Sequence, residues 1–260
     1  MGKLLIIRHG HTSLNLPGRD ERLRGWLDVP LDQEGLAEAA ETADFIRQNH
    51  EVDAIYCSDL RRTRQTGEVL RRKTGAAVTY TSDLRPWNLG VFCGQRVREI
   101  IPFLNLLNQH PDLAAPSGES FYQFYGRYAH RLRLLLSEAE ASPNSIAVVT
   151  HVRNLLASSN IILDGDRDKV PVTGGPHTGA IMVVEKVLGA WKMHTGSSAT
   201  RIVPPQSQDL AALYPVSVAS RLEIGSVIAA AAQLPKGVDT QLIADVSEGA
   251  HNDRTESRCR

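Results

Sequence analysis

One stretch near the N-terminus, Leu4-Leu5-Ile6-Ile7-Arg8-His9-Gly10-His11-Thr12, decides how the rest of the sequence is interpreted. Its first half is a short apolar run, which predicts a β-strand over residues 4–8. Its second half ends the strand with an arginine and places two histidines and a glycine directly after it. Ligands of open α/β sheets bind beyond the carboxyl ends of the strands. The stretch therefore predicts a cluster in which His9 faces a crevice, Arg8 lies beside it and Gly10 permits close backbone approach.

Short β-branched runs alternate with segments of helical period along most of the chain. The expected strands cover residues 4–8, 54–57, 77–81, 146–150 and 180–185, and the expected helices cover residues 36–46, 60–73, 122–141 and 155–162. Asp32 is the expected N-cap of the first helix. Alternating strands and helices are typical of an α/β protein with a mainly parallel sheet. We therefore predict a three-layer sandwich in which helices flank a mainly parallel central sheet.

The alternation ends at about residue 195, which gives the expected domain boundary. Residues 1–195 are predicted to form one α/β domain. Residues 196–260 are predicted to form a C-terminal extension that is partly helical and has a polar, disordered end. The sequence indicates neither the role of this extension nor the oligomeric state.

The composition argues against two classes of partner. The 260 residues include 29 Lys and Arg against 29 Asp and Glu, so the chain has no global field to attract nucleic acid or an acidic membrane. Three widely spaced cysteines, Cys57, Cys93 and Cys259, show neither metal-ligand spacing nor a disulfide framework, which favours reduced thiols and a cytoplasmic location. The N-terminal apolar run is too short for a signal peptide, and no later segment reaches membrane-spanning length without charges.

Two further segments are predicted to bring basic residues to the same sheet edge. Thr150-His151 ends one expected strand, and Ser58-Asp59-Leu60-Arg61-Arg62-Thr63 follows another and opens a helix. Free backbone N–H groups and the positive end of the helix dipole favour an anion at a helix start. Three strand ends would then deliver two histidines and at least two arginines to one rim. Such a set of side chains is suited to binding phosphate.

Four blocks of sequence, in the same order, resemble the histidine phosphatase superfamily (phosphoglycerate mutase-like), and its phosphatase branch in particular. The first block comprises Arg8-His9-Gly10-His11-Thr12-Ser13-Leu14-Asn15 and Arg22-Leu23-Arg24-Gly25-Trp26-Leu27-Asp28-Val29-Pro30-Leu31. The others are Ser58-Asp59-Leu60-Arg61-Arg62-Thr63-Arg64-Gln65-Thr66, Pro116-Ser117-Gly118-Glu119-Ser120 and Val148-Val149-Thr150-His151. The resemblance covers residues 1 to about 195, which would make this part the catalytic domain.

The resemblance implies a metal-independent phosphomonoester hydrolase that needs no cofactor and acts on a small phosphorylated substrate. His9 would be the nucleophile and become phosphohistidine. Arg8, Arg62 and His151 would hold the phosphoryl oxygens, with Asn15 completing the pocket. Physical chemistry agrees, because positioning and charge stabilisation dominate phosphoryl transfer and arginine binds phosphate through directed bonds. The nucleophile must present a neutral ring nitrogen, and a second histidine can assist as a cation.

One position departs from the family's pattern. A glutamate usually stands two residues after the leucine in the block that here reads Leu84-Arg85-Pro86-Trp87-Asn88-Leu89-Gly90, and that position is Pro86. Proline donates no proton, whereas a positioned acid contributes about 10²–10⁴ in rate. Asp83 and Glu119 are the nearest candidate proton donors. Alternatively, the site has no acid and favours substrates whose leaving group departs as an anion, or phosphoramidates.

Two other functions stay open from the sequence. A mutase of the same family would return the phosphoryl group to a sugar-acid phosphate, and the missing glutamate ranks it below the hydrolase. A non-catalytic phosphate-binding module is the other, and Pro86 is the feature that favours it.

Overall fold

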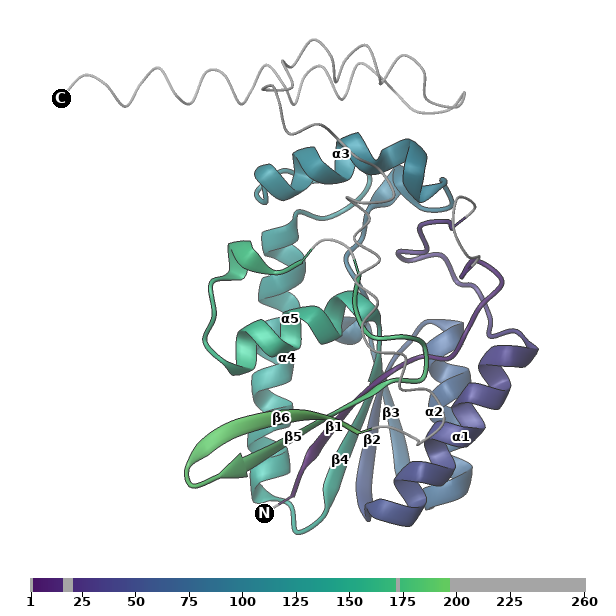
Figure 1. Ribbon diagram of the computed structural model, residues 1–260, viewed down its shortest axis with the longest axis vertical. Coiled ribbons are helices and arrows are strands. Elements are labelled where there is room, and N and C mark those ends of the chain that lie inside the picture. The colour runs from purple at the N-terminus through teal and green to yellow at the C-terminus, as the bar shows by residue number, and fades with distance from the viewer. Residues whose placement is uncertain (1, 16–20, 172–173, 197–260) are drawn as a thin grey trace, which may run out of the picture.

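The computed structural model describes residues 2–15, 21–171 and 174–196, which form a six-stranded sheet with helices on both faces (Figure 1). The strands are β1 (Leu4–Arg8), β2 (Val52–Ser58), β3 (Ala77–Thr81), β4 (Ser145–Thr150), β5 (Ile181–Val187) and β6 (Ala190–Gly196). The α-helices are α1 (Gln33–Asn49), α2 (Arg61–Thr74), α3 (Val97–Gln109), α4 (Phe121–Ala141) and α5 (Val152–Ile162). From residue 197 onward, the predicted C-terminal extension lies outside the described residues.

The strands are ordered β3-β2-β4-β1-β5-β6 across the sheet. The first four run parallel to one another, and β5 and β6 add an antiparallel hairpin at one edge. The predicted α/β class, with helices flanking a mainly parallel sheet, is therefore confirmed. The carboxyl ends of β1, β2 and β4 lie at the same edge, which is the arrangement that a ligand site in such a sheet requires.

Alternate residues of β1 enter two hydrophobic clusters on opposite faces of the sheet. Leu4 and Ile6 belong to the cluster that includes residues of α3, α4 and α5, whereas Leu5 and Ile7 pack with residues of α1 and α2. All four side chains are 0% exposed. Full burial of one such side chain stabilises the fold by about 1.5–3 kcal/mol. Strand β1 is thus held firmly from both sides, and so are the residues that follow it.

Two elements were not predicted from the sequence, α3 and β6. Pro102 lies inside α3 and interrupts the sequence signal of a helix, yet Ile100, Phe103 and Leu104 are buried in the core. Strand β6 contains no apolar run, and it forms because β5 turns back through Leu188 and Gly189, both with positive φ. Tertiary packing and hairpin pairing therefore decide these two elements.

The predicted start of the first helix is confirmed. Asp32 caps α1, since its side chain accepts a hydrogen bond of 2.9 Å from the Gly35 amide. At α4 the N-cap is Ser120, which forms a capping box with Gln123.

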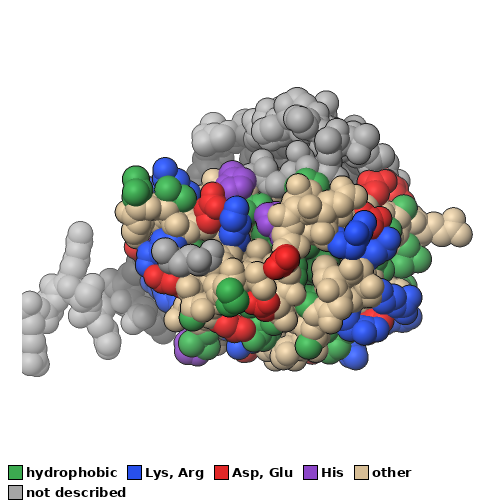
Figure 2. All heavy atoms as spheres, turned by 90° about the horizontal axis from the view of Figure 1, so that it is seen from below, with side chains coloured by type: hydrophobic (Ala, Val, Ile, Leu, Met, Phe, Trp, Pro, Cys, Tyr) green, Lys and Arg blue, Asp and Glu red, His purple; other side chains and the backbone are tan. Residues whose placement is uncertain are grey.

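The described part of the chain has no helix that combines the length and apolarity needed to cross a membrane. Figure 2 views the molecule from below, and on that face Lys and Arg side chains lie among Asp and Glu side chains. This mixture contrasts with the pocket at the carboxyl edge of the sheet, where arginines gather.

Candidate active site

The two motif histidines meet at the carboxyl edge because they follow neighbouring parallel strands. Arg8 of β1 lies opposite Thr150 of β4, and the amide of His9 donates to the Thr150 carbonyl oxygen at 3.0 Å. The ring centroids of His9 and His151 are 5.2 Å apart, at an interplanar angle of 63°. Both rings line one cavity together with Arg8 and Arg62. The structure thus brings together the four residues that the motifs indicate.

The hydrogen bonding of His9 fixes which ring nitrogen is available. The ring is buried, and its Nδ1 lies 2.7 Å from the Gly10 carbonyl oxygen. A carbonyl oxygen only accepts, so Nδ1 carries the proton and Nε2 keeps its lone pair. Burial, followed by the charges of Arg62 and Arg8, lowers the pKa of His9 well below its ordinary value. The ring is therefore neutral and can act as a nucleophile through Nε2.

Position 10 has room only for a glycine. A Cβ atom at this position would lie 2.3 Å from the Gly35 carbonyl oxygen at the start of α1. The Gly10 amide also donates to the Thr66 hydroxyl of α2 over 3.2 Å. The loop after β1 is thus packed against two helices, and this packing orients His9.

His151 has partners at both ring nitrogens. Arg62 Nε donates to its Nδ1 at 3.3 Å, and its Nε2 lies 3.0 Å from the Ser58 hydroxyl. Because Nδ1 accepts a bond, the proton is assigned to Nε2 and the ring is neutral. Burial and the charge of Arg62 lower the pKa of His151 well below its ordinary value. The cationic assistance expected from this histidine does not fit these contacts.

The two motif arginines are held by backbone carbonyls. Arg62 is 1% exposed, and its terminal nitrogens donate to the carbonyl oxygens of Leu27 and Gly25 at 2.7 and 2.8 Å. Arg8 donates to the Pro176 carbonyl oxygen, while its buried Nε has no partner among the described residues. Burial lowers the pKa of both guanidinium groups to about 9. A buried N–H without an acceptor is costly, so an anion in the cavity would satisfy Arg8 Nε.

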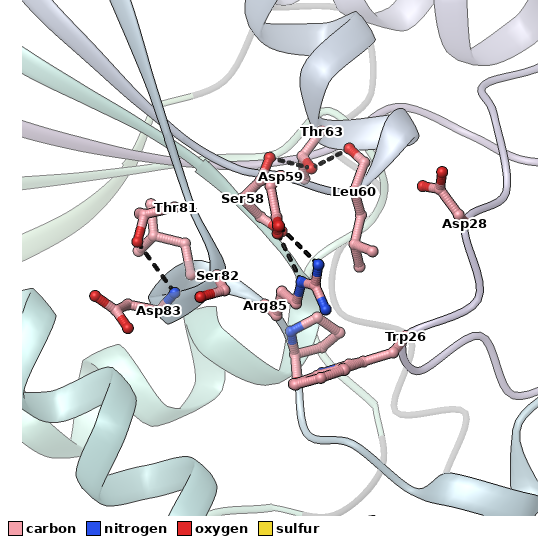
Figure 3. Close-up of polar contacts among 12 residues, drawn as sticks. Trp26, Asp28, Ser58, Asp59, Leu60, Thr63, Thr81, Ser82, Asp83 and Arg85 are labelled. Carbon is pink, nitrogen blue, oxygen red and sulfur yellow. Dashed lines mark hydrogen bonds and ion pairs between the residues drawn. The ribbon is translucent and has the colours of Figure 1, made fainter.

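A second wall of the cavity is formed by the segments around residues 24 and 86. Trp26 Nε1 donates to the Pro86 carbonyl oxygen at 2.8 Å and so joins the two segments. Arg85 lies with its guanidinium 4.5 Å from the centre of the Trp26 ring and forms two bonds of 2.6 and 2.7 Å to Asp59 (Figure 3). This clamp fixes Pro86 at the cavity, although Pro86 itself has no proton to donate.

Three predicted site residues do not line the cavity. The Asn15 side chain accepts hydrogen bonds from the amide and the hydroxyl of Thr12, at 3.0 and 2.8 Å, and so closes the turn after His9. Glu119 is paired with Arg127 at 2.7 Å. Asp83 lies in a short 3₁₀ turn, and its carboxylate points away from the Arg85–Asp59 pair (Figure 3). Neither candidate proton donor is thus brought to the histidines.

The structure adds three charged residues that were not singled out from the sequence, Glu21, Arg24 and Arg153. Arg24 stands two residues before Trp26 and Arg153 two residues after His151, so each lies within or beside a motif block. That proximity was the available signal. Arg24 reaches the cavity from a loop and Arg153 from the first turn of α5, and spacing alone does not reveal where either side chain lies.

The cavity also has an apolar part. Its lining side chains there come from the first loop, the segment after β3, α3 and α5, and they are Leu23, Pro86, Trp87, Leu89, Val97, Leu104 and Val152.

Among the described residues, no group of three or more His, Cys, Asp or Glu side chains could hold a metal ion.

The fold and the site define an α/β protein with a basic pocket built around two histidines at the carboxyl edge of the sheet. A family model described as the histidine phosphatase superfamily (branch 1) matches residues 4–196. The chain belongs to this superfamily.

Similar proteins include both mutases and phosphatases. A 2,3-bisphosphoglycerate-dependent phosphoglycerate mutase of Methanosarcina mazei is 42% identical over 80 residues, which cover 30% of this chain and 32% of the relative. Phosphoglycerate mutase-like protein 4 of Arabidopsis thaliana is 29% identical over 156 residues, or 57% of this chain and 66% of the relative. The chain thus matches about a third of the first relative's length and just under two thirds of the second's.

Among solved structures, a mycobacterial glucosyl-3-phosphoglycerate phosphatase in complex with VO3 has a TM-score of 0.63. It is 23% identical, over 75% of this chain and 98% of that protein. Bacillus stearothermophilus YhfR has the same TM-score at 24% identity, over 75% of this chain and 96% of that protein. These likenesses establish the shared fold.

Proposed function

We propose that the protein is a metal-independent phosphomonoester hydrolase that acts on a small phosphorylated substrate through a phosphohistidine at His9. The observation that supports this most is the bond from His9 Nδ1 to the Gly10 carbonyl oxygen, which leaves Nε2 as a neutral nucleophile beside Arg8 and Arg62. Neutral imidazole among guanidinium groups is the combination that attack on a phosphoryl dianion needs.

The proposed reaction has two steps. His9 Nε2 attacks phosphorus, and the bond from phosphorus to the ester oxygen breaks. Water then attacks phosphorus, the P–N bond breaks, and inorganic phosphate leaves while Nε2 recovers its lone pair. Arg8 and Arg62 would stabilise the charge on the phosphoryl oxygens throughout. His151 would contribute a hydrogen bond from Nε2–H, which here is directed at Ser58.

The test is the incubation of the full chain with 4-nitrophenyl phosphate and, separately, with a sugar-acid phosphate. We expect free phosphate from the aryl ester. Accumulation of an isomer from the sugar-acid phosphate, without phosphate release, would instead favour the mutase, the activity that the names of the relatives suggest.

The missing acid gives a second test. Pro86 lies in the cavity, and the absence of a proton donor at this position favours either a substrate with a stable leaving anion or a non-catalytic phosphate-binding module. We expect Pro86→Glu to raise turnover of alkyl phosphates by about tenfold or more and to leave aryl phosphates within a few-fold. Phosphate binding without turnover of either ester, by both proteins, would favour the binding module. A cytoplasmic location stays a prediction from the sequence.

A further inference from the structure

Arg24 occupies a position in the cavity that the proposed two-step reaction does not use. It lines the same cavity as His9 and Pro86, and its side chain is 13% exposed. Its Nη1 donates to the Leu14 carbonyl oxygen at 3.1 Å, and its Nη2 lies 3.4 Å from a carboxylate oxygen of Glu21. A largely buried guanidinium, held by the loop after β1, is therefore part of the cavity lining.

The electrostatic influence of Arg24 places its charge close to the reacting groups. After burial, Arg24 is the next cause of the lowered pKa values of Arg8 and Arg62. It is a smaller cause, after burial and nearer charges, of the lowered pKa values of His9 and His151. One guanidinium that acts on all four groups, and that lines the same cavity, lies within electrostatic range of each of them.

The backbone on the C-terminal side of Arg24 is fixed by contacts to the site itself. The carbonyl oxygens of Gly25 and Leu27 accept bonds from Arg62, and Trp26 bonds to the Pro86 carbonyl oxygen. The stacking of Arg85 on Trp26 adds a further restraint (Figure 3). Arg24 and Pro86 consequently lie on segments of the same wall whose relative position is set by direct bonds.

An arginine beside a proline suggests a different way to handle the leaving group. An acid would protonate the departing oxygen, whereas a guanidinium keeps its proton and stabilises a negative oxygen by charge and hydrogen bonds. Such stabilisation is strongest where water is excluded. The apolar side chains that line part of this cavity favour that exclusion.

On the basis of the proposed function, we propose that Arg24 holds the departing oxygen of the substrate as an anion and thereby replaces a proton donor. As His9 Nε2 bonds to phosphorus, the electron pair of the breaking P–O bond stays on the ester oxygen. That oxygen leaves as a phenoxide or enolate bound to Arg24 and takes a proton from water once it is released. This step needs no oxidant, metal or further reactant.

The substrate class follows from this assignment. Arginine stabilises an anion without neutralising it, so the leaving group must itself be acidic, as a phenol or an enol is. The apolar lining from Leu23, Trp87 and Val97 suits an aromatic or otherwise apolar body. An aryl or enol phosphate therefore fits the cavity better than the phosphate of a simple alcohol.

The experiment measures kcat/KM for a series of substituted phenyl phosphates whose phenols differ in acidity, with wild type, Arg24→Gln and Arg24→Lys. We expect Arg24→Gln to lower kcat/KM by about 10²-fold or more for the least acidic phenols and by much less for the most acidic ones. The dependence of the rate on phenol acidity should become steeper. Arg24→Lys keeps the charge and should recover part of the loss.

Two matched variants serve as controls. Arg133→Gln removes an exposed arginine of α4 and should change neither rate nor slope. Glu21→Gln removes the carboxylate beside Arg24 and should keep the slope of wild type. If Glu21→Gln steepens the slope and Arg24→Gln does not, Glu21 is the proton donor and the assignment of Arg24 is wrong.

The competitive inhibition constant of inorganic phosphate provides the remaining readout. If Arg24→Gln weakens phosphate inhibition and every substrate equally, Arg24 only binds the phosphoryl group and the inference fails, while the hydrolase stands. If wild type forms no phosphohistidine with any aryl phosphate, the proposed function itself fails. A quench experiment that traps phosphorylated His9 therefore separates the two failures.

Discussion

His9 and His151 occupy equivalent places in the fold, yet their hydrogen-bond partners suit them to different chemical roles. Each ring follows the last residue of a central parallel strand, and each is buried. His9 uses one nitrogen for the carbonyl of its neighbour Gly10 and presents the other to the cavity. His151 has both nitrogens engaged, by Arg62 and Ser58. Equal position in the sheet therefore does not give equal chemistry, because the hydrogen-bond partners assign the protons.

The difference also explains why only one of the two is a candidate nucleophile. Arg62 donates to His151 Nδ1, which occupies the lone pair that an attack would need. The remaining nitrogen of His151 carries a proton and can only donate. The same residue, Arg62, thus orders His151 and repels a proton from His9.

We expect the largest effect from His9→Ala, because this variant removes the one of the two histidines that is the candidate nucleophile. We expect phosphate release from 4-nitrophenyl phosphate to fall by about 10⁴-fold or more, because no other group forms the covalent intermediate. Alkaline-quench trapping of the base-stable, acid-labile phosphohistidine measures the intermediate directly. His130→Ala, on the exposed surface of α4, is the matched control and should retain full activity. Undiminished phosphorylation in His9→Ala would exclude the nucleophile assignment.

A smaller effect is expected from His151→Ala. This variant removes the hydrogen bond that we propose His151 donates to the phosphoryl group, and it leaves the buried Arg62 Nε without its acceptor. We expect kcat to fall by about 10²–10³-fold, as for the loss of one preorganised donor, while phosphohistidine still forms slowly. Steady-state and single-turnover rates measure the two steps. Complete loss of the intermediate would mean that the two histidines act as one unit.

The pH dependence of stability tests the neutrality of both rings. Burial depresses the pKa of His9 and His151, so below pH 6.5 the unfolded chain binds protons at these residues and the folded protein does not. Stability is then present above the unfolded pKa and is lost as the pH falls below it, by up to about 1.4 kcal/mol per pH unit for each ring.

Urea unfolding of wild type and His151→Gln between pH 5 and 6.5 measures this slope. The variant should lose the contribution of one histidine, so its slope should be smaller by up to about 1.4 kcal/mol per pH unit. An identical slope in both proteins would show that His151 binds a proton in the folded state.

We expect the smallest effect from Ser58→Ala. This variant removes one of the two hydrogen-bond partners that distinguish His151 from His9. The Ser58 hydroxyl lies 3.0 Å from His151 Nε2, and no backbone contact changes. We expect a loss of less than about tenfold in kcat/KM and about 1 kcal/mol in the free energy of unfolding, the usual worth of a buried hydrogen bond. A loss as large as that of His151→Ala would mean that Ser58 alone orients the ring.

The fold could be predicted from the sequence where local signals and burial agree. The bounds of β1 and β3 match the expected strands, because each is a short run with strand-forming residues that ends before a clear change in sequence pattern. Helix α3 was missed because Pro102 contradicts its pattern, and only packing against the core stabilises it. Among the proposed site residues, those at strand ends were predictable, since parallel strands bring their carboxyl ends together. Arg24 and Arg153 were not, because Arg24 enters the cavity from a loop and Arg153 from the first turn of α5.

By itself, the sequence determined which side chains follow the central strands, and therefore that His9, Arg8 and His151 share one edge of the sheet. It also determined that Pro86 stands where an acid is usual. Only the tertiary structure decided which ring nitrogen of each histidine bears the proton, and that Arg24 reaches the cavity while Asn15 and Glu119 do not line it. The physical reason is that strand order follows from local patterns, whereas protonation and loop position depend on partners that are distant in sequence.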